Sequence, residues 1–248
     1  AQIVAFKVTK AALLMIGIGF TMFFASKQER TQQYGTMVMG LGLVFFGMSV
    51  MSDGMNPLRS YQPFLDLMMK MENPLIGILV AAGFTGLIQS SSATTGIVIV
   101  MASQGFITLP AGIALAFGAN VGTCVTAMLA SIGKPREAVR AAIVHIGFNI
   151  AGVLVWVMFI DELAQFVTSF SPAHPELAGA DRLGAETPRQ IANAHTIFNI
   201  ANTLIFIGFT TQIARLVEKI IPDAPLEKEG MLVRAKYLSE ELLSTPSL

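Results

Sequence analysis

The stretch from Gly83 to Thr95 reads Gly83-Phe84-Thr85-Gly86-Leu87-Ile88-Gln89-Ser90-Ser91-Ser92-Ala93-Thr94-Thr95, and it lies inside an apolar segment that runs over 74–102. Six of the seven residues from Gln89 to Thr95 are polar. A straight helix of 29 residues would be about 44 Å long, whereas the hydrocarbon core of a bilayer is about 30 Å thick. The surplus length and the polar centre predict two half-length helices that meet at depth as a re-entrant hairpin. A kinked full-length span is the alternative.

The composition around this segment is that of an integral membrane protein. Of 248 residues, 53% are hydrophobic and 13% are charged, against about 25% charged in an ordinary soluble domain. Mean hydropathy is +0.64. The net charge is zero, so nothing indicates a nucleic-acid partner. No nucleophile–base pair or metal-ligand cluster in the sequence indicates an enzyme. We therefore expect an all-α, multi-pass bundle in the lipid bilayer, with no cofactor.

Other segments of the chain predict the rest of this bundle. Residues 57–72 mix charged and large apolar side chains in a pattern typical of an amphipathic helix at the membrane interface. Residues 161–188 contain three prolines and five acidic residues, and they predict a polar loop. Apolar segments of near-membrane length predict further helices over 11–25, 35–51, 138–160 and 189–210.

A second interruption, Gly118-Ala119-Asn120-Val121-Gly122-Thr123, predicts that the apolar stretch 110–132 is a broken helix. Between Glu72 and Lys134 the chain carries no charged residue. Broken helices at membrane depth occur only around a buried site or a water-filled cavity. Helix N-termini suit an anion, and freed carbonyls and hydroxyls suit a small cation, so two successive breaks indicate a transport site. The alternative is that the small residues only let helices pack closely.

An internal echo links two of the predicted helices. Seven of fifteen positions match between residues 145–159 and 195–209. The echo is either a remnant of duplication or a shared packing demand on two helices. The polar residues in and beside it predict contacts between helices first and a lining of the transport pathway second: His145, Asn149, His195, Asn199 and Asn202.

The charges in the joints between helices predict an orientation. Basic residues cluster at 27–30, 134–140 and 215–219, whereas 161–188 carries five acidic residues and one basic residue. The positive-inside rule places the basic joints in the cytoplasm. Lys7 and Lys10 then fall on the opposite side.

The two motifs together, Gly83 to Thr95 followed by Gly118 to Thr123, resemble those of the type II sodium-dependent phosphate cotransporters, and most closely their bacterial branch. The resemblance covers roughly residues 35–215. That family is built from two inverted repeats, each with a Gln-Ser-Ser-Ser hairpin and a Gly-x-Asn-x-Gly-Thr segment. This sequence contains one Gln-Ser-Ser-Ser, so the resemblance implies half of an inverted-repeat transporter.

The resemblance also implies a division of the chain. Residues 1–34 look like the end of the preceding repeat, with one transmembrane helix and a joint, and residues 35–221 look like the second transmembrane repeat. Residues 222–248 look like a cytoplasmic linker toward the PhoU-like domain of some bacterial members. We therefore expect an excerpt of a longer protein, whose missing first repeat is needed to complete the site.

The function implied by the resemblance is sodium-coupled symport of inorganic phosphate by alternating access, in the bacterial inner membrane, with sodium as coupling ion. One alternative is a symporter of a dicarboxylate or sulfate on the same scaffold. Another is a non-transporting membrane platform for a regulatory domain. Carried over by motif position, the sodium ligands are Gln89, Ser90, Ser91, Asn120, Thr123 and Thr126, and the phosphate contacts are Ser91, Ser92, Thr94 and Thr95.

Overall fold

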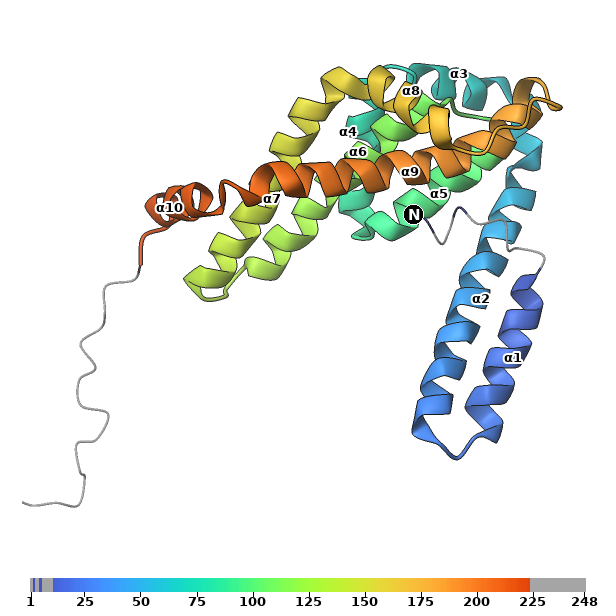
Figure 1. Ribbon diagram of the computed structural model, residues 1–248, viewed down its shortest axis with the longest axis horizontal. Helices are drawn as coiled ribbons and strands as arrows, with labels where there is room; N and C mark the ends of the chain where they lie inside the picture. Colours follow the sequence, from blue (N-terminus) through green and yellow to red (C-terminus); the bar gives the residue numbers. More distant parts are fainter. Residues whose placement is uncertain (1, 3–4, 6–10, 224–248) are drawn as a thin grey trace, which may run out of the picture.

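The computed structural model describes residues 2, 5 and 11–223, and all regular structure in this part of the chain is helical (Figure 1). The predicted all-α fold is therefore confirmed. In chain order the elements are α1 (Ala12–Ala25), α2 (Glu29–Met55), the 3-10 helix η2 (Asn56–Ser60), α3 (Gln62–Lys70), α4 (Pro74–Ile88), α5 (Ser91–Ser103), α6 (Leu109–Ser131), α7 (Arg136–Trp156), the 3-10 helix η3 (Val157–Phe159), α8 (Ile160–Phe170), α9 (Gly179–Ile207) and α10 (Thr210–Ile220).

Helices α1 and α2 form an antiparallel hairpin that stands away from the other helices (Figure 1). The two helices approach closely because Gly19 and Gly35 face each other across the contact, where each lacks a side chain. The hairpin is joined to the rest of the protein by a small core, in which Phe45 and Met48 of α2 pack with Ile99 and Val100 of α5. The apolar face of α2 thus borders the helix that follows the Gln-Ser-Ser-Ser motif.

Helices α4 and α5 are the two arms of a hairpin with Gln89 at its tip. Gln89 adopts the left-handed conformation (φ 53°), which no other non-glycine residue adopts in the described ranges. Ser90 then caps α5 by accepting the N–H of Ala93. Across the arms, the hydroxyl oxygens of Thr85 and Thr94 lie 2.7 Å apart in a buried hydrogen bond. The polar run therefore ends one helix and begins the next, as the sequence predicts.

The two open ends of this hairpin lie on the same side. Thr108, which follows α5 and caps α6, donates a hydrogen bond of 2.7 Å to the carboxylate of Glu72, just before α4. Gln104 at the end of α5 is also bound by Arg59 of η2. A kinked full-length span would place these ends on opposite sides of the membrane, so the geometry is that of the re-entrant hairpin.

This arrangement predicts the labelling of two cysteines. In a Cys124→Ser background, Asn73→Cys and Gln104→Cys are expected to react with an impermeant thiol reagent from the same side of the membrane. Lys134→Cys, at the far end of α6, is the control and is expected to react from the opposite side. Labelling of positions 73 and 104 from opposite sides would contradict the re-entrant hairpin.

The predicted break in the second motif is wrong, because α6 is one continuous helix from Leu109 to Ser131. Its glycines serve close packing instead. A Cβ on Gly118 would lie 2.3 Å from the carbonyl oxygen of Ile78, and a Cβ on Gly122 would lie 2.4 Å from Cβ of Thr85. Helices α4 and α6 run parallel, since Ile78 meets Gly118 and Thr85 meets Gly122. The small-residue alternative was therefore the correct one for these positions.

The predicted loop over 161–188 is also wrong, since only residues 171–178 lack helical structure. Helix α8 forms because Ile160, Leu163, Ala164 and Val167 recur at helical spacing and are all buried. Helix α9 begins at Gly179 and contains Pro188 in its interior. The expected interfacial helix over 57–72 is two short helices, η2 and α3, and α3 is bent 108° from α4.

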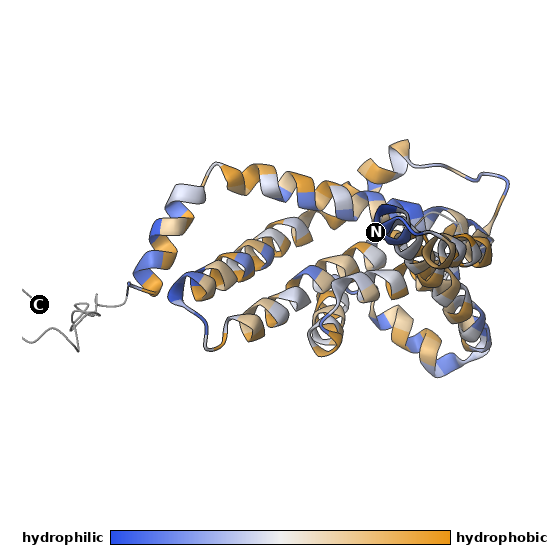
Figure 2. Ribbon diagram, turned by 90° about the horizontal axis from the view of Figure 1, so that it is seen from below, coloured by the Kyte–Doolittle hydropathy of each residue, from blue (hydrophilic) through white to orange (hydrophobic). Residues whose placement is uncertain are grey.

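The described helices include enough apolar length for a multi-pass protein. Three helical stretches could cross a membrane, namely Glu29–Ser60, Leu109–Ser131 and Arg136–Phe170, and two bent helix pairs raise this number to five if each is one span. Apolar residues make up much of these helices (Figure 2), and many large ones are exposed. Leu79 and Leu87 of α4, for example, are 71% and 81% exposed. Such faces suit lipid or a second transmembrane repeat.

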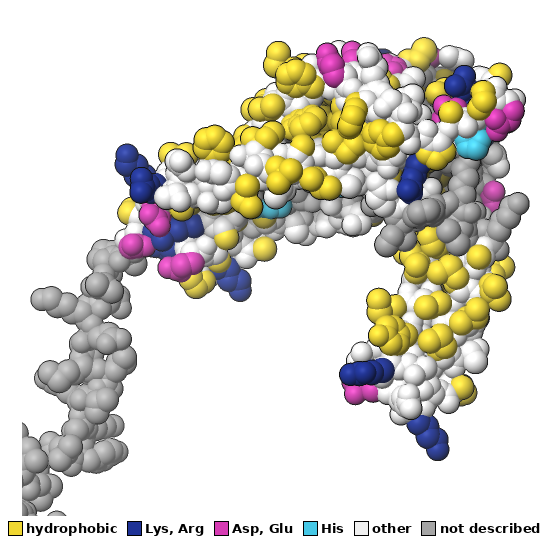
Figure 3. Space-filling model, in the orientation of Figure 1, with side chains coloured by type: hydrophobic (Ala, Val, Ile, Leu, Met, Phe, Trp, Pro, Cys, Tyr) yellow, Lys and Arg dark blue, Asp and Glu magenta, His cyan; other side chains and the backbone are white. Residues whose placement is uncertain are grey.

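Charged side chains gather at the two ends of the helices (Figure 3). Lys and Arg side chains lie at the tip of the α1–α2 hairpin and around α10, where acidic side chains accompany them, whereas mainly acidic side chains lie around α8. This partial separation follows the charge pattern of the sequence. The cytoplasmic placement of the basic end stays a prediction, and the tail from residue 224 lies outside the described residues.

Candidate functional site

A large cavity of about 1010 Å³ lies between α2, α5, α6 and α9. Its wall on the α2 side is apolar. Its other walls carry some of the polar residues of both motifs and of the echo. The polar side chains that line it are Gln2, Ser91, Ser92, Thr95, Asn120, His195 and Thr196. Residues separated by more than 100 positions in the sequence therefore meet at one cavity.

The first turn of α5 faces this cavity and provides free backbone donors. Ser90 is in extended conformation as N-cap, and its side chain accepts from Ala93 N while its carbonyl accepts from Thr94 N. Helix geometry leaves the N–H groups of Ser91 and Ser92 without an intrahelical acceptor. Together with the positive end of the helix dipole and two hydroxyls, they form an arrangement that favours an anion.

Helix α4 ends where α5 begins, so a negative helix end lies beside a positive one. The carbonyls of the last turn of α4 have lost their helical donors, apart from Thr85 O, which accepts from Gln89 N at 2.7 Å. Such carbonyls, with nearby hydroxyls, suit a small hard cation. The hairpin thus brings cation-binding and anion-binding groups within a few residues of each other.

Asn120 of α6 is a buried polar residue of the cavity wall, with 9% of its surface exposed. Its Oδ1 lies 3.4 Å from Nε2 of His195 on α9. Its Nδ2 has no hydrogen-bond partner in the described ranges. A buried amide nitrogen without a partner is costly, so this N–H₂ group is a candidate hydrogen-bond donor to a bound ligand.

The two echoed motifs both contact α6. His145 of α7 places Nε2 3.4 Å from the hydroxyl of Thr123, one turn along α6 from the Asn120–His195 contact. In each motif the asparagine four residues after the histidine bonds to the histidine's backbone carbonyl. Asn149 Nδ2 donates to His145 O at 2.9 Å, and Asn199 Nδ2 donates to His195 O at 2.7 Å. The shared spacing in the sequence therefore corresponds to a shared contact with the second motif.

Asn202 lies further along α9, away from the cavity. It is buried and its Nδ2 lies 3.5 Å from Phe148 O of α7. Gly152 of α7 provides the space for it, because a Cβ there would meet the amide at 2.4 Å. This contact joins two helices, which is the first of the two roles expected for the polar residues of the echo.

The predicted site residues fall into two groups in space. Ser91, Ser92, Thr95 and Asn120 line the cavity. The remaining predicted ligands lie at or near the hairpin tip or inside the packing and do not line it: Gln89 is exposed, Ser90, Thr123 and Thr126 are half-buried, and Thr94 is buried in its bonds to Thr85 and to Ser90 O.

Three polar residues near the site were not predicted. Thr85 is fully buried and joins the hairpin arms, although the quoted motif already contained it. Thr196 lines the cavity directly after His195. Gln2 donates from Nε2 to Ala192 O, Asn193 Oδ1 and Thr196 Oγ1 at 3.0–3.1 Å. No local pattern around Gln2 could have indicated contacts across 190 residues.

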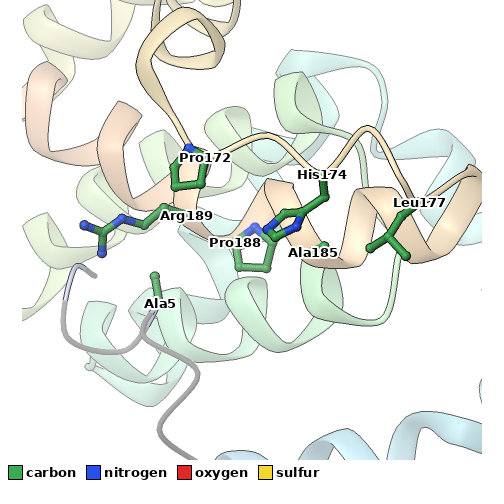
Figure 4. A pocket seen from close by; sticks show the side chains of 7 residues that line it. All are labelled: Ala5, Pro172, His174, Leu177, Ala185, Pro188 and Arg189. Carbon is green, nitrogen blue, oxygen red and sulfur yellow. The ribbon is translucent and has the colours of Figure 1, made fainter.

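A smaller cavity of about 460 Å³ lies at the acidic end, between residues 171–178 and α9 (Figure 4). Its lining is mostly proline, alanine and leucine, with His174 and Arg189 as its polar members. Glu176 lies beside it, 2.9 Å from His174 Nδ1. The pKa of this carboxyl is lowered, first by a backbone N–H and then by His174. No Ser or Thr hydroxyl among the described residues lines this smaller cavity, unlike the larger one, so it is a poorer candidate for an ion-binding site.

Comparison with known proteins finds a matching family and several relatives. The sequence profile of a family described as Na+/Pi-cotransporter matches residues 1–53 and 59–220. The uncharacterized protein YqeW of Bacillus subtilis is 31% identical over 156 residues, which are 62% of this chain and 51% of that protein. The sodium-dependent phosphate transport protein 2C of Rattus norvegicus is 41% identical over 85 residues, 33% of this chain and 14% of that protein.

A third relative is the putative inorganic phosphate export protein YjbB of Escherichia coli, 27% identical over 178 residues, 71% of this chain and 33% of that protein. The chain therefore spans about half the length, or less, of these relatives. No solved structure matches it.

Proposed function

Because the chain belongs to the Na+/Pi-cotransporter family, we propose that it forms one repeat of a membrane symporter that moves inorganic phosphate together with sodium by alternating access. It is a transporter-family membrane protein and not an enzyme. The observation that carries the proposal is the first turn of α5, whose free N–H groups and serine hydroxyls face the large cavity beside Asn120.

Coupling to a cation follows from the charges around this cavity. No Lys or Arg occurs between Glu72 and Lys134, the segment that holds the hairpin and α6. A phosphate dianion there would have a heavy desolvation penalty with only neutral donors to compensate it. Sodium bound at the adjacent end of α4 supplies the missing positive charge. The affinity for each ion then depends on the other, as reciprocal linkage requires.

The two groups of residues support separate subsites. We assign phosphate to the cavity wall, with Ser91 and Ser92 as the main donors and Thr95 beside them. We assign sodium to the hairpin tip and α6, with oxygen atoms from Gln89, Ser90, Thr123 and Thr126. Ser91, at the junction, serves both. Thr94 is a support of the hairpin, because its hydroxyl is already bonded to Thr85 and Ser90.

Asn120 fits phosphate better than sodium, which revises its assignment by motif position. Its oxygen is directed to His195, whereas its nitrogen has no partner in the described residues. An N–H₂ group donates hydrogen bonds and cannot ligate a cation. In this assignment His195 is a positioning residue that binds the oxygen of Asn120 and leaves its nitrogen to donate to the anion.

The proposal is tested by uptake of labelled phosphate into liposomes that contain a protein with this chain and both repeats. We expect uptake that depends on an inward sodium gradient and fails when potassium replaces sodium. Arsenate, which mimics phosphate, should compete, whereas succinate and sulfate in equal amount should not.

Other outcomes of this experiment distinguish the alternatives. Competition by succinate or sulfate without competition by arsenate would assign another anion to the same scaffold. Absence of any sodium-dependent anion uptake by correctly inserted protein would contradict the proposal and favour a membrane platform.

A further inference from the structure

Helix α10 leaves the direction of α9 by a bend of 78° at Gly208 and Phe209. The first part of α9 carries Asp181, Arg182, Glu186 and Arg189, so its part without Asp, Glu, Lys or Arg is residues 190–207. Those 18 residues are about 27 Å long at 1.5 Å per residue, close to the roughly 30 Å of a bilayer core. This part of α9 is therefore nearly long enough to cross without α10, and α10 runs steeply across its end.

The apolar side chains of α10 form one stripe, of which only part is used by the protein. Ile213, Leu216, Val217 and Ile220 recur at helical spacing. Val217 is buried (5% exposed), and α10 packs against α7. Leu216 and Ile220 are both 58% exposed, and Phe209 at the bend is 55% exposed. One edge of the stripe is thus directed away from the protein.

The basic side chains of α10 border that exposed edge. At about 100° per residue, Lys219 and Arg215 follow Leu216 around the helix on the side away from Val217, whereas Glu218 falls on the flank next to Val217. The surroundings are basic as well (Figure 3). Among the described residues, this end holds five basic and three acidic side chains: Lys134, Arg136, Arg140, Arg215 and Lys219 against Glu137, Glu218 and Asp223.

The far end of α10 is fixed to α7. Arg140 donates to Ile221 O at 3.0 and 2.8 Å and forms an ion pair of 2.6 Å with Asp223, and Arg136 also donates to Pro222 O. Two cations thus satisfy carbonyls at the C-terminal end of the helix, where positive charge is favourable. These bonds and the packing of α10 against α7 attach the helix to the spans.

We propose that α10 is an interfacial helix that binds anionic phospholipid at the basic face of the membrane. Leu216 and Ile220 enter the boundary between headgroups and acyl chains, and Arg215 and Lys219 extend to the phosphate groups of the lipids. An amphipathic helix of this kind, attached at a steep angle to a spanning helix, is typical of interfacial segments. Anionic leaflets attract such basic residues.

The test uses the protein that contains this chain, reconstituted in nanodiscs, in a Cys124→Ser background with a bimane fluorophore at Leu216→Cys. The matched control carries it at Thr211→Cys, on the polar face. Brominated acyl chains are expected to quench position 216 at least threefold more strongly than position 211, and aqueous iodide is expected to show the reverse order.

Charge is tested with brominated phosphatidylglycerol diluted into unbrominated phosphatidylcholine. The mole fraction that gives half-maximal quenching at position 216 should rise by about fivefold for each of Arg215→Gln and Lys219→Gln. Lys27→Gln, at the distant tip of the α1–α2 hairpin, should leave it unchanged. Equal quenching of positions 211 and 216 would overturn the proposal. So would protection of position 216 from both quenchers, because another protein surface would then cover the helix.

Discussion

Replacing Gly118 or Gly122 with alanine is expected to lower the thermal stability of the protein, whereas replacing Gly83 with alanine should leave it unchanged or raise it. A Cβ on Gly118 would lie 2.3 Å from Ile78 O and 2.7 Å from Cβ of Ala81. A Cβ on Gly122 would lie 2.4 Å from Cβ of Thr85 and 2.7 Å from Ala82 O. Backbone and β-carbon atoms cannot rotate away, so α4 and α6 must separate.

The expected cost is on the order of 1–3 kcal/mol for each substitution, as for other overpacked contacts. Gly83→Ala is the matched control because it lies on α4, where a Cβ would find nothing within 4 Å. In a helix interior this change alone gains about 0.5–1 kcal/mol. Thermal unfolding of the purified protein in detergent measures the difference. If Gly118→Ala and Gly83→Ala unfold alike, the close contact between α4 and α6 is not present in solution.

This contact also explains why a broken helix was wrongly predicted at α6. Glycines and an asparagine in an apolar segment indicate either a broken helix or a helix that packs closely on a neighbour. The local sequence pattern of a broken helix and that of a closely packed helix are the same. What decides between them is α4, whose Ile78 and Thr85 meet Gly118 and Gly122, and no pattern within 110–132 describes that neighbour.

The hairpin at Gln89 could be predicted because its signals are local. Six polar side chains in the centre of an apolar stretch have no partners in lipid, and the stretch is too long for one span. The loop predicted over residues 161–188 was wrong because the structure there depends on contacts with other helices. Prolines and charges suggested a loop, yet α8 is held by its buried stripe, and α9 continues through Pro188. Membrane helices tolerate proline when their surroundings satisfy the freed groups.

The sequence predicted which residue types form the site, but it predicted less well which of them lie together in space. Motif position named Ser91, Ser92 and Asn120, which do line one cavity. It could not separate Asn120 from the sodium ligands, because the contact to His195 spans 75 residues. The echo around His145 and His195 was visible in the sequence, but its common partner, α6, appears only in the fold.

The assignment of subsites predicts two classes of transport mutant in the protein that contains both repeats. Gln89→Ala and Thr126→Ala are expected to raise the sodium concentration needed for half-maximal uptake. Ser92→Ala and Asn120→Leu are expected to raise the phosphate concentration needed. Removal of one ligand from a poorly solvated ion costs on the order of 1–3 kcal/mol, which is roughly ten- to a hundredfold in the concentration required.

Linkage makes the two classes separable although the ions assist each other. Each mutant also shifts the apparent affinity for the second ion, but the shift is smaller when the co-ion is saturating. Uptake is therefore measured over a range of sodium at saturating phosphate and then over a range of phosphate at saturating sodium. Asn120→Leu is the deciding variant: a sodium phenotype like that of Gln89→Ala would mean that its oxygen ligates the cation and that His195 does not orient it. If none of the four variants changes either curve while the proteins still insert and fold, the ions bind elsewhere, and the hairpin and the wall of the large cavity are structural contacts between helices.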